Sequence, residues 1–383
     1  MSEVSEEDKS IAVATIRENV KENIRIARLK HRQNELDNLR ITHGKLEDLS
    51  INLQTFTKDN VLATANKIKK QRHASATELM KLSHSFLQSS ENINCFVNAT
   101  GALPVIVKEM TGTNTEKQLL AVECLCNLSL GSANDCEKIA QKAGTYLHTF
   151  LESSNESIVK TTLWCCTNLI VAGKKSLDIL LSQELIRSLI NVTRSIHNKN
   201  LKDEALIAIE LVLDHGGVPK LSDVETLSKW ILSQTAPLDP SITKIIYKLL
   251  DLLQFQSKDV IGMQKLVFIC FETLIHLYNG SATSSLQSTR SSEHLHQVVL
   301  HMRILSNIVA LENSFADLII ETWFVNQSRS LASFYNHFID LFSAHSVSIE
   351  EIYWFIGNLM KCQLGEVSLK YLETDQFFAQ IKM

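Results

Sequence analysis

Apolar residues recur at three- and four-residue spacings through most of the chain, and polar breaks divide them into a repeated unit. The stretch GALPVIVKEM at 101–110 is followed by the polar break TGTNTE and then by a longer apolar run, KQLLAVECLCNLSL, from Lys117. The same order returns from Ala143, as AGTYLHTFLESS and then SIVKTTLWCCTNLIV. Because this spacing is typical of amphipathic helices, each unit is predicted to be a helix, a turn and a longer helix.

An Asn or acidic residue returns at one place on the longer helix. Asn127 and Asn168 lie 41 residues apart, Asn168 and Glu210 lie 42 apart, and Glu210 and Asp251 lie 41 apart. A period of about 40–47 residues is typical of stacked armadillo or HEAT repeats. We therefore predict an all-α, armadillo/HEAT-like right-handed α-solenoid of about seven repeats over residues 74–383.

The spacing widens after Asp251, where Asn307 and Asn358 are the next residues in the same place. The polar, low-complexity stretch NGSATSSLQSTRSS accounts for the first of these gaps, so a disordered insertion loop is predicted over 279–293. The second gap has no such explanation, and the repeat phase after about residue 255 is open.

Residues 1–60 carry a different pattern. Their apolar residues, from Val13 to Ala27, again recur at three and four, which predicts one amphipathic helix. This helix is basic, since a single acid, Glu22, stands among the cations Lys21, Arg25, Arg28, Lys30 and Arg32. Residues 61–73, which hold a second basic cluster, are predicted to be a linker between this helix and the repeats.

The repeated helix presents two residues four apart, which lie on one helical face. Twice they are Trp and Asn, as Trp164/Asn168 and Trp354/Asn358. An Asn side chain both donates and accepts hydrogen bonds, so it can pair with the backbone of an extended peptide, and a Trp face attracts cations. The candidate peptide-binding residues are Trp164, Asn168, Asn127, Glu123, Glu210, Asp251, Asn307, Trp354 and Asn358.

On these residues, and on IRIARLKHRQNELDNLR and LWCCTNLIVAGKKSLDILLSQELI, the chain resembles the importin-alpha group of armadillo proteins. Within it, the chain is most similar to the transmembrane and coiled-coil domain-containing protein 6 family. The resemblance covers roughly residues 15–215 well and the rest more loosely. It implies that the Trp/Asn pairs bind basic localisation-signal peptides in a concave groove. It also implies that the cations at 21–32 bind importin beta or fold onto that groove.

Three departures from the importin-alpha pattern bear on cargo binding. Each of the two sites keeps only one full Trp/Asn pair, Glu210 and Asp251 stand in place of Asn, and Arg303 would repel a basic cargo. Since each net hydrogen bond contributes about 0.5–1.5 kcal/mol, weaker or altered cargo binding is expected. The family name also implies membrane spans and a coiled coil, and no apolar run here is long enough for a span.

Composition narrows the function classes. The net charge of −4 over 383 residues argues against a general nucleic-acid binder, and the start MSEVSEEDKS does not read as a secretory signal. The eight cysteines have no metal-ligand spacing and are expected to be reduced core residues. The sequence shows no set of residues that could serve as a nucleophile, its general base and a group that orients the base. We therefore expect no enzyme, no cofactor and no metal.

The resulting hypothesis is a monomeric, cytoplasmic adaptor or regulator of nuclear import that binds protein partners and shuttles to the nucleus. Two alternatives remain. One is a cytosolic scaffold that has lost transport and binds a non-basic partner, and the other is a peripheral membrane protein that uses the basic helix.

Overall fold

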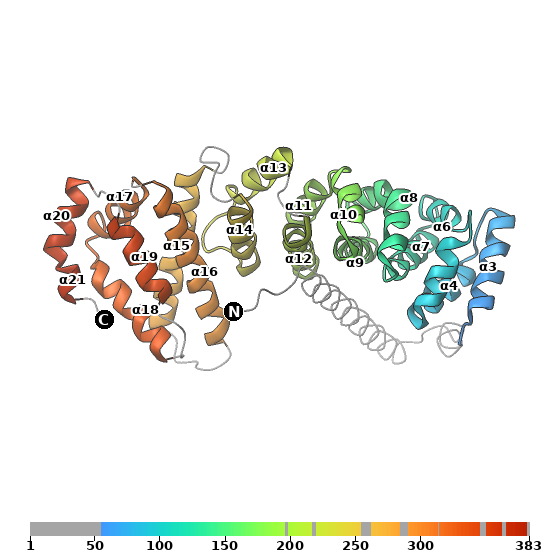
Figure 1. Cartoon of the computed structure of the whole chain (residues 1–383), viewed down its shortest axis with the longest axis horizontal. Coiled ribbons are helices and arrows are strands. Elements are labelled where there is room, and N and C mark those ends of the chain that lie inside the picture. The colour runs from blue at the N-terminus through green and yellow to red at the C-terminus, as the bar shows by residue number, and fades with distance from the viewer. Residues whose placement is uncertain are drawn as a thin grey trace, which may run out of the picture. The chain divides into compact units, whose positions relative to one another are not determined.

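A computed structural model describes residues 55–195, 198–216, 220–253, 262–283, 290–312, 314–344, 350–361 and 365–380. The chain divides into two compact units, unit 1 up to Gly216 and unit 2 from Gly217. The described parts of both units are helical and contain no strand, as the apolar spacing predicts (Figure 1).

Unit 1 is a succession of helices joined by short breaks. Its described helices are α3 (Lys58–Gln71), α4 (Ala76–Gln88), α5 (Ser90–Asn98), α6 (Leu103–Met110), α7 (Thr115–Leu128), α8 (Ala133–Leu151), α9 (Glu156–Ala172), α10 (Lys174–Leu181), α11 (Leu185–Ser195) and α12 (Lys199–Gly216).

The polar breaks between apolar runs are helix caps. The Asn114 side chain accepts from the backbone N–H of Lys117 at the start of α7, and Asn155 caps α9 in the same way. Ser132 and Asp135 form a reciprocal capping box at the start of α8. Such caps satisfy backbone N–H groups that have no partner within the helix, so the breaks set where each helix begins.

Helices α4, α7, α9 and α12 pack one against the next, and we call them the ladder helices of unit 1. The remaining helices flank them, as α6 packs on α7 and α8 packs on α9. Each repeat therefore buries its apolar residues against the following repeat as well as within itself, which is how a solenoid is stabilised. This arrangement is an armadillo-like α-solenoid.

Unit 2 is likewise built from helices that pack one against the next, and α15 and α16 are its longest. Its described helices are α13 (Leu221–Ile231), α14 (Pro240–Leu252), α15 (Met263–Thr283), α16 (Arg290–Leu311), α17 (Ser314–Ile320), the π-helix η1 (Glu321–Val325), α18 (Leu331–Ala344), α19 (Glu350–Lys361), α20 (Glu366–Asp375) and α21 (Phe377–Gln380). Its ladder helices are α14, α16 and α19, because α14 packs on α16 and α16 on α19. They hold Asp251, Asn307 and Asn358, so the repeat phase that the sequence left open is now set.

The predicted insertion loop over 279–293 is wrong at both ends. Helix α15 continues through Thr283 and α16 begins at Arg290, so the polar residues there extend the two helices, and residues 284–289 lie outside the described part. The 51-residue gap between Asn307 and Asn358 also has a cause. Three helical pieces, α17, η1 and α18, separate α16 from α19.

The predicted linker over 61–73 is also wrong, because most of it belongs to α3. Val61, Ala65 and Ile68 are buried along one side of this helix, which packs on α5 and α4. Lys67 pairs with Glu78 of α4 at 2.7 Å. Burial alone would raise the pKa of Glu78, but hydrogen bonds from Lys67 and Ser75 lower it to about 2. Residues 61–73 are thus largely part of the folded unit.

The cores of the two units differ in composition. Unit 1 is mainly aliphatic and holds six buried, unbridged cysteines, and Cys270 of unit 2 is likewise buried. The burial of these seven confirms that they are core residues, while Cys362 lies outside the described residues. Unit 2 has an aromatic cluster in which the Phe271 ring lies 4.7 Å from Trp323 and 5.8 Å from both Phe324 and Phe334.

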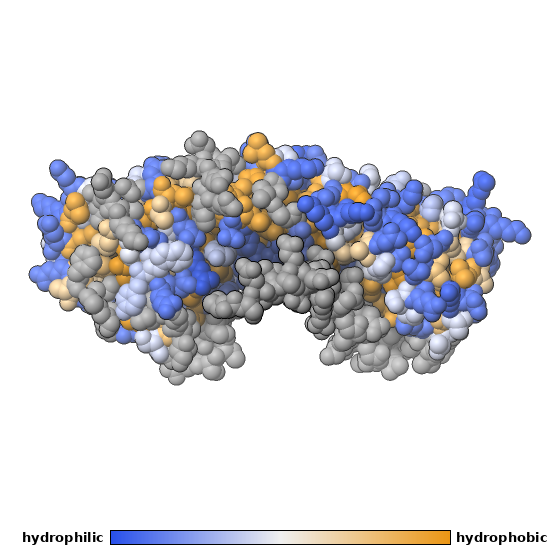
Figure 2. All heavy atoms as spheres, in the orientation of Figure 1, coloured by the Kyte–Doolittle hydropathy of each residue, from blue (hydrophilic) through white to orange (hydrophobic). Residues whose placement is uncertain are grey.

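The surface is mixed in polarity. On the face drawn in Figure 2, hydrophilic side chains cover much of the described surface and hydrophobic patches lie between them. Among the described residues, no helix combines the length and the apolarity needed to cross a bilayer. The described residues begin at position 55. The predicted basic helix, with the cations Lys21, Arg25, Arg28, Lys30 and Arg32, therefore lies outside them.

Candidate peptide-binding face

The first residues of the repeated pairs lie on the exposed side of the ladder helices. In unit 1, Glu123 of α7 and Trp164 of α9 are partly exposed, and in unit 2 Trp354 of α19 is 49% exposed. Along α9, Lys160, Trp164 and Thr167 are partly exposed, while Thr162, Leu163, Cys165 and Cys166 are buried. The spacing of the three partly exposed residues places them on one helical face. The first position of the pair therefore faces solvent on α7, α9 and α19, whereas on α12 the equivalent residue, Leu206, is only 4% exposed.

The asparagines four residues further on are buried instead. Asn127, Asn168 and Asn358 are only 6%, 2% and 8% exposed. Each donates through Nδ2 to a backbone carbonyl of the preceding ladder helix. The bonds run from Asn127 to Ser83 (2.9 Å), from Asn168 to Cys126 (3.0 Å) and from Asn358 to Ser306 (3.4 Å).

These three bonds obey one rule. The accepting carbonyl belongs to the residue just before the corresponding position in the preceding repeat, since Ser83, Cys126 and Ser306 precede His84, Asn127 and Asn307. A buried amide with such partners stabilises the contact between repeats. The recurrence of Asn therefore has a structural cause, which is to join neighbouring ladder helices.

For two of these residues the structure differs from the expected peptide contact. Asn127 also donates to Ser83 Oγ (2.9 Å), and Asn168 also donates to Ser129 Oγ (2.8 Å). An amide has two N–H donors, so both donors of each side chain are engaged within the protein. Asn168 Oδ1 is buried and has no hydrogen-bond partner in the described structure. A peptide carbonyl cannot accept from these amides without breaking the contact between repeats.

Trp164 carries a cation on its ring in this structure. Lys160, one turn earlier on α9, places Nζ 4.8 Å from the ring centroid. This lies within the about 6 Å over which an ammonium is attracted to an aromatic face. The geometry shows that the exposed indole face accommodates a cationic side chain, here one from the same helix.

Carboxylates stand on both ladder helices that neighbour Trp164. Glu123 on α7 and Glu210 on α12 are partly exposed, and both helices pack directly on α9. Two further acids, Asp203 and Asp214, share the helical face of Glu210, at one to two turns from it. We call the exposed side of α7, α9 and α12 around Glu123, Trp164 and Glu210 the ladder face of unit 1.

In unit 2 an ion pair joins two ladder helices. Arg303 of α16 donates from Nε to Glu351 Oε1 of α19 at 2.8 Å, and its terminal nitrogen meets the same oxygen. The hydrogen bonds that Arg303 donates to Glu351 raise the pKa of Arg303. The expected repulsion of a basic cargo by Arg303 is therefore offset, since the charge is neutralised by a neighbouring ladder helix.

The other predicted residues of unit 2 are spread along its ladder helices. Asp251 at the end of α14 is exposed, Asn307 on α16 is partly exposed, and Trp354 on α19 is half exposed. Their successive helices pack on one another. The sequence prediction thus placed all nine candidates on ladder helices, but their side chains divide between solvent and the repeat contacts.

Lys160, Glu351 and the serine acceptors were missed from the sequence. Lys160 had a readable signal, because it lies four residues before Trp164 on a predicted helix. Glu351 had none, since it is 48 residues from its partner. No group of three or more possible metal ligands gathers in the described parts of the chain.

Comparison with known proteins finds similarity to solved armadillo structures at low identity. No family model and no curated protein matches it in sequence. A designed armadillo repeat protein in complex with the peptide (KR)4 is 17% identical, covers 65% of this chain and 99% of its own, and gives a TM-score of 0.47. An engineered protein is 13% identical over 88% of this chain and 93% of its own, also at 0.47. At these values the assignment as an armadillo-like α-solenoid rests on the packing of the chain's own helices.

Proposed function

We propose that this chain is a protein-binding scaffold that holds an extended basic segment on the ladder face of unit 1. The observation that carries the proposal is the ammonium of Lys160 on the Trp164 ring at 4.8 Å, between ladder helices that bear Glu123 and Glu210. A Lys or Arg of a partner would use the same aromatic surface, and the flanking carboxylates would favour its charge.

The buried asparagines change how such a segment would be held. With Asn127 and Asn168 engaged between repeats, the peptide backbone would lose the pairing that importin-alpha-like binding implies. Recognition would then rest on the side chains of the partner. An interaction built on exposed cation–π and ionic contacts is modest in strength, so weak and salt-sensitive binding is expected.

The affinity of a labelled (KR)4 peptide for the full chain tests this function. Trp164→Ala is expected to weaken binding about fivefold, because the aromatic contact is lost. Lys160→Gln is expected to strengthen binding by a similar factor of about two to five, because the competing ammonium is removed. Fluorescence anisotropy measures both.

The matched control is Lys265→Gln, which makes the same charge change at an exposed site on α15 of unit 2. Opposite effects of the Trp164 and Lys160 variants, with the control unchanged, would support the proposal. Absence of binding, or equal affinity in all four proteins, would favour a scaffold with a non-basic partner. The designed armadillo protein solved with (KR)4 serves as the positive control for the assay.

We further propose a role in nuclear import, in which the cations Lys21, Arg25, Arg28, Lys30 and Arg32 bind importin beta or occupy the ladder face in cis. Five positive charges within twelve residues of a predicted helix suit the carboxylates of that face. Replacing all five with Gln in the full chain is expected to raise the affinity for (KR)4 at least twofold if they compete in cis.

Direct measurement of importin beta binding by the same variant separates the two modes. Loss of that binding with unchanged (KR)4 affinity would assign the helix to the partner, and no change in either measurement would refute both. Partition of the tagged chain between cytoplasm and nucleus, with and without these charges, tests the proposed shuttling.

A further inference from the structure

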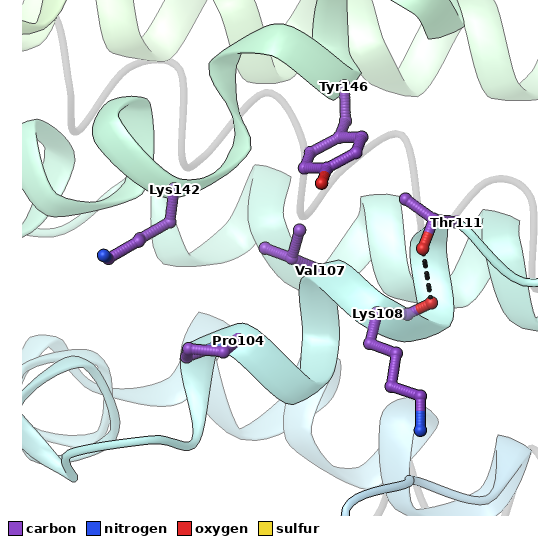
Figure 3. Close-up of a pocket in the computed structure, with 6 residues that line it drawn as sticks. All are labelled: Pro104, Val107, Lys108, Thr111, Lys142 and Tyr146. Carbon is purple, nitrogen blue, oxygen red and sulfur yellow. Dashed lines mark hydrogen bonds between the residues drawn. The ribbon is translucent and has the colours of Figure 1, made fainter.

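A hollow lies on the flanking helices of unit 1, away from the residues of the ladder face. It has a volume of about 330 Å³ and is lined by Pro104, Val107, Lys108, Thr111, Lys142 and Tyr146. The first four come from α6 and the turn after it, and the last two come from α8, so two successive repeats build it (Figure 3).

The hollow combines an apolar floor with a polar rim. Val107 is 7% exposed, and in Figure 3 the Tyr146 ring lies above it with the hydroxyl directed toward α6. Tyr146 is 41% exposed. The volume of the hollow lies at the lower end of the range of about 300–1,000 Å³ found for ligand pockets. This size suits one or two inserted side chains.

The rim is positively charged. Lys108 and Lys142 are exposed, and neither pairs with a carboxylate in the described structure. Lys108 Nζ donates only to the backbone carbonyl of Arg72, at 3.0 Å. That contact brings the end of α3, with its own cations Lys69 and Lys70, toward the same side.

The nearby acids are already engaged. Glu109 accepts from the backbone N–H of Ala74 at 2.9 Å and pairs with Lys117 at 3.5 Å. Glu137 of α8 pairs with Lys175 at 3.3 Å. The two rim lysines therefore keep an unbalanced positive charge beside an apolar floor and a phenol.

We propose that this hollow is a second docking site, which takes an acidic protein segment with an aliphatic or aromatic side chain between its carboxylates. The apolar side chain would insert against Val107 and Tyr146, and the carboxylates would meet Lys108 and Lys142. Charge complementarity selects the occupant. The recessed floor favours a peptide over a membrane, because a flat headgroup layer reaches the lysines but not Val107.

This site is independent of the ladder face, and it would let unit 1 hold segments of opposite charge on different helices. The test uses a labelled peptide, EDELFEDE, and the full chain in fluorescence anisotropy. The double variant Lys108→Glu/Lys142→Glu is expected to weaken binding at least about tenfold. Tyr146→Ala is expected to weaken it as well, while Trp164→Ala leaves it unchanged.

The matched control is Lys220→Glu/Lys265→Glu, which changes the net charge equally at two exposed lysines of unit 2. Equal loss in the control would show non-specific charge attraction and overturn the proposal. Replacing the Leu-Phe pair of the probe with Ser-Ser separates the apolar contribution, and unchanged affinity there would also contradict an inserted side chain. Binding to phosphatidylserine vesicles without peptide binding would assign the lysines to a membrane instead.

Discussion

Asn168→Asp is expected to lower the free energy of unfolding of unit 1 by about 3–5 kcal/mol at neutral pH, the cost of a buried charge without a partner. Both N–H donors of Asn168 are used, by the carbonyl of Cys126 and by Ser129 Oγ. A carboxylate of the same shape offers only acceptors, so it would face the Cys126 carbonyl at 2% exposure. Asn168→Ala loses the hydrogen bonds without burying a charge, and a smaller cost of about 1–3 kcal/mol is expected.

The pH dependence of the Asp variant identifies the cause. Burial raises the pKa of the new carboxyl above its ordinary value, so its penalty is present at neutral pH and shrinks as the pH falls and the group is protonated. Urea unfolding gives the free energy, and hydrogen exchange of α7 and α9 locates the loss.

Asn200→Asp is the matched control for this change. Asn200 is exposed in the first turn of α12, where a change within about 0.5 kcal/mol is expected. A stable Asn168→Asp protein with undisturbed exchange in α7 and α9 would show that the amide does not join the repeats.

His301 is expected to make unit 2 acid-sensitive. This side chain on α16 is fully buried, its Nδ1 donates to the carbonyl of Gln297 at 2.8 Å, and Thr243 Oγ1 of α14 lies 3.5 Å from Nε2. Burial lowers the pKa of His301 from 6.5 to about 4.

The direction of the effect follows from proton binding. Below about pH 6.5 the unfolded chain binds a proton at His301 that the folded chain accepts only below about 4. Stability is therefore lost as the pH falls through this window, by about 3 kcal/mol in total. Urea unfolding between pH 7.5 and 4.5 measures this, and hydrogen exchange in α14 and α16 reports it locally.

His301→Leu isolates this contribution from the other titrating groups. It is expected to flatten the slope of stability against pH between 6.5 and 4, whereas His296→Leu, at an exposed site on the same helix, leaves the slope unchanged. Equal slopes in the wild type and in the His301 variant would mean that this histidine does not titrate abnormally.

The sequence predicted where the repeats lie better than it predicted what the repeated residues do. The spacing from Asn127 to Asp251 placed these residues on successive ladder helices, because the period follows from repeat length. The same amide can bond either to a bound peptide or to the preceding helix, and spacing does not distinguish these two partners. The hydrogen bonds of the buried Asn127 and Asn168 to Ser83 and Cys126 show that the partner is the preceding helix.

Two other differences have separate causes. The prediction of a linker over 61–73 rested on its basic residues. The spacing of four and three between Val61, Ala65 and Ile68 is a helical signal that the sequence already contained. The pairing of Arg303 with Glu351 could not be read, since the residues are 48 apart and belong to helices separated by the irregular segment that contains η1. The net charge at Arg303 therefore depends on a partner that tertiary packing provides and that sequence spacing does not indicate.

The position of a bound basic peptide on the full chain tests the central claim most directly. A (KR)4 peptide with a benzophenone group at its centre would be photo-crosslinked and the adducts mapped by mass spectrometry. Adducts concentrated on α7, α9 and α12 around Trp164, and displaced by unlabelled peptide, are the predicted result. Adducts confined to the flanking helices, or none that unlabelled peptide displaces, would contradict a basic segment held on the ladder face.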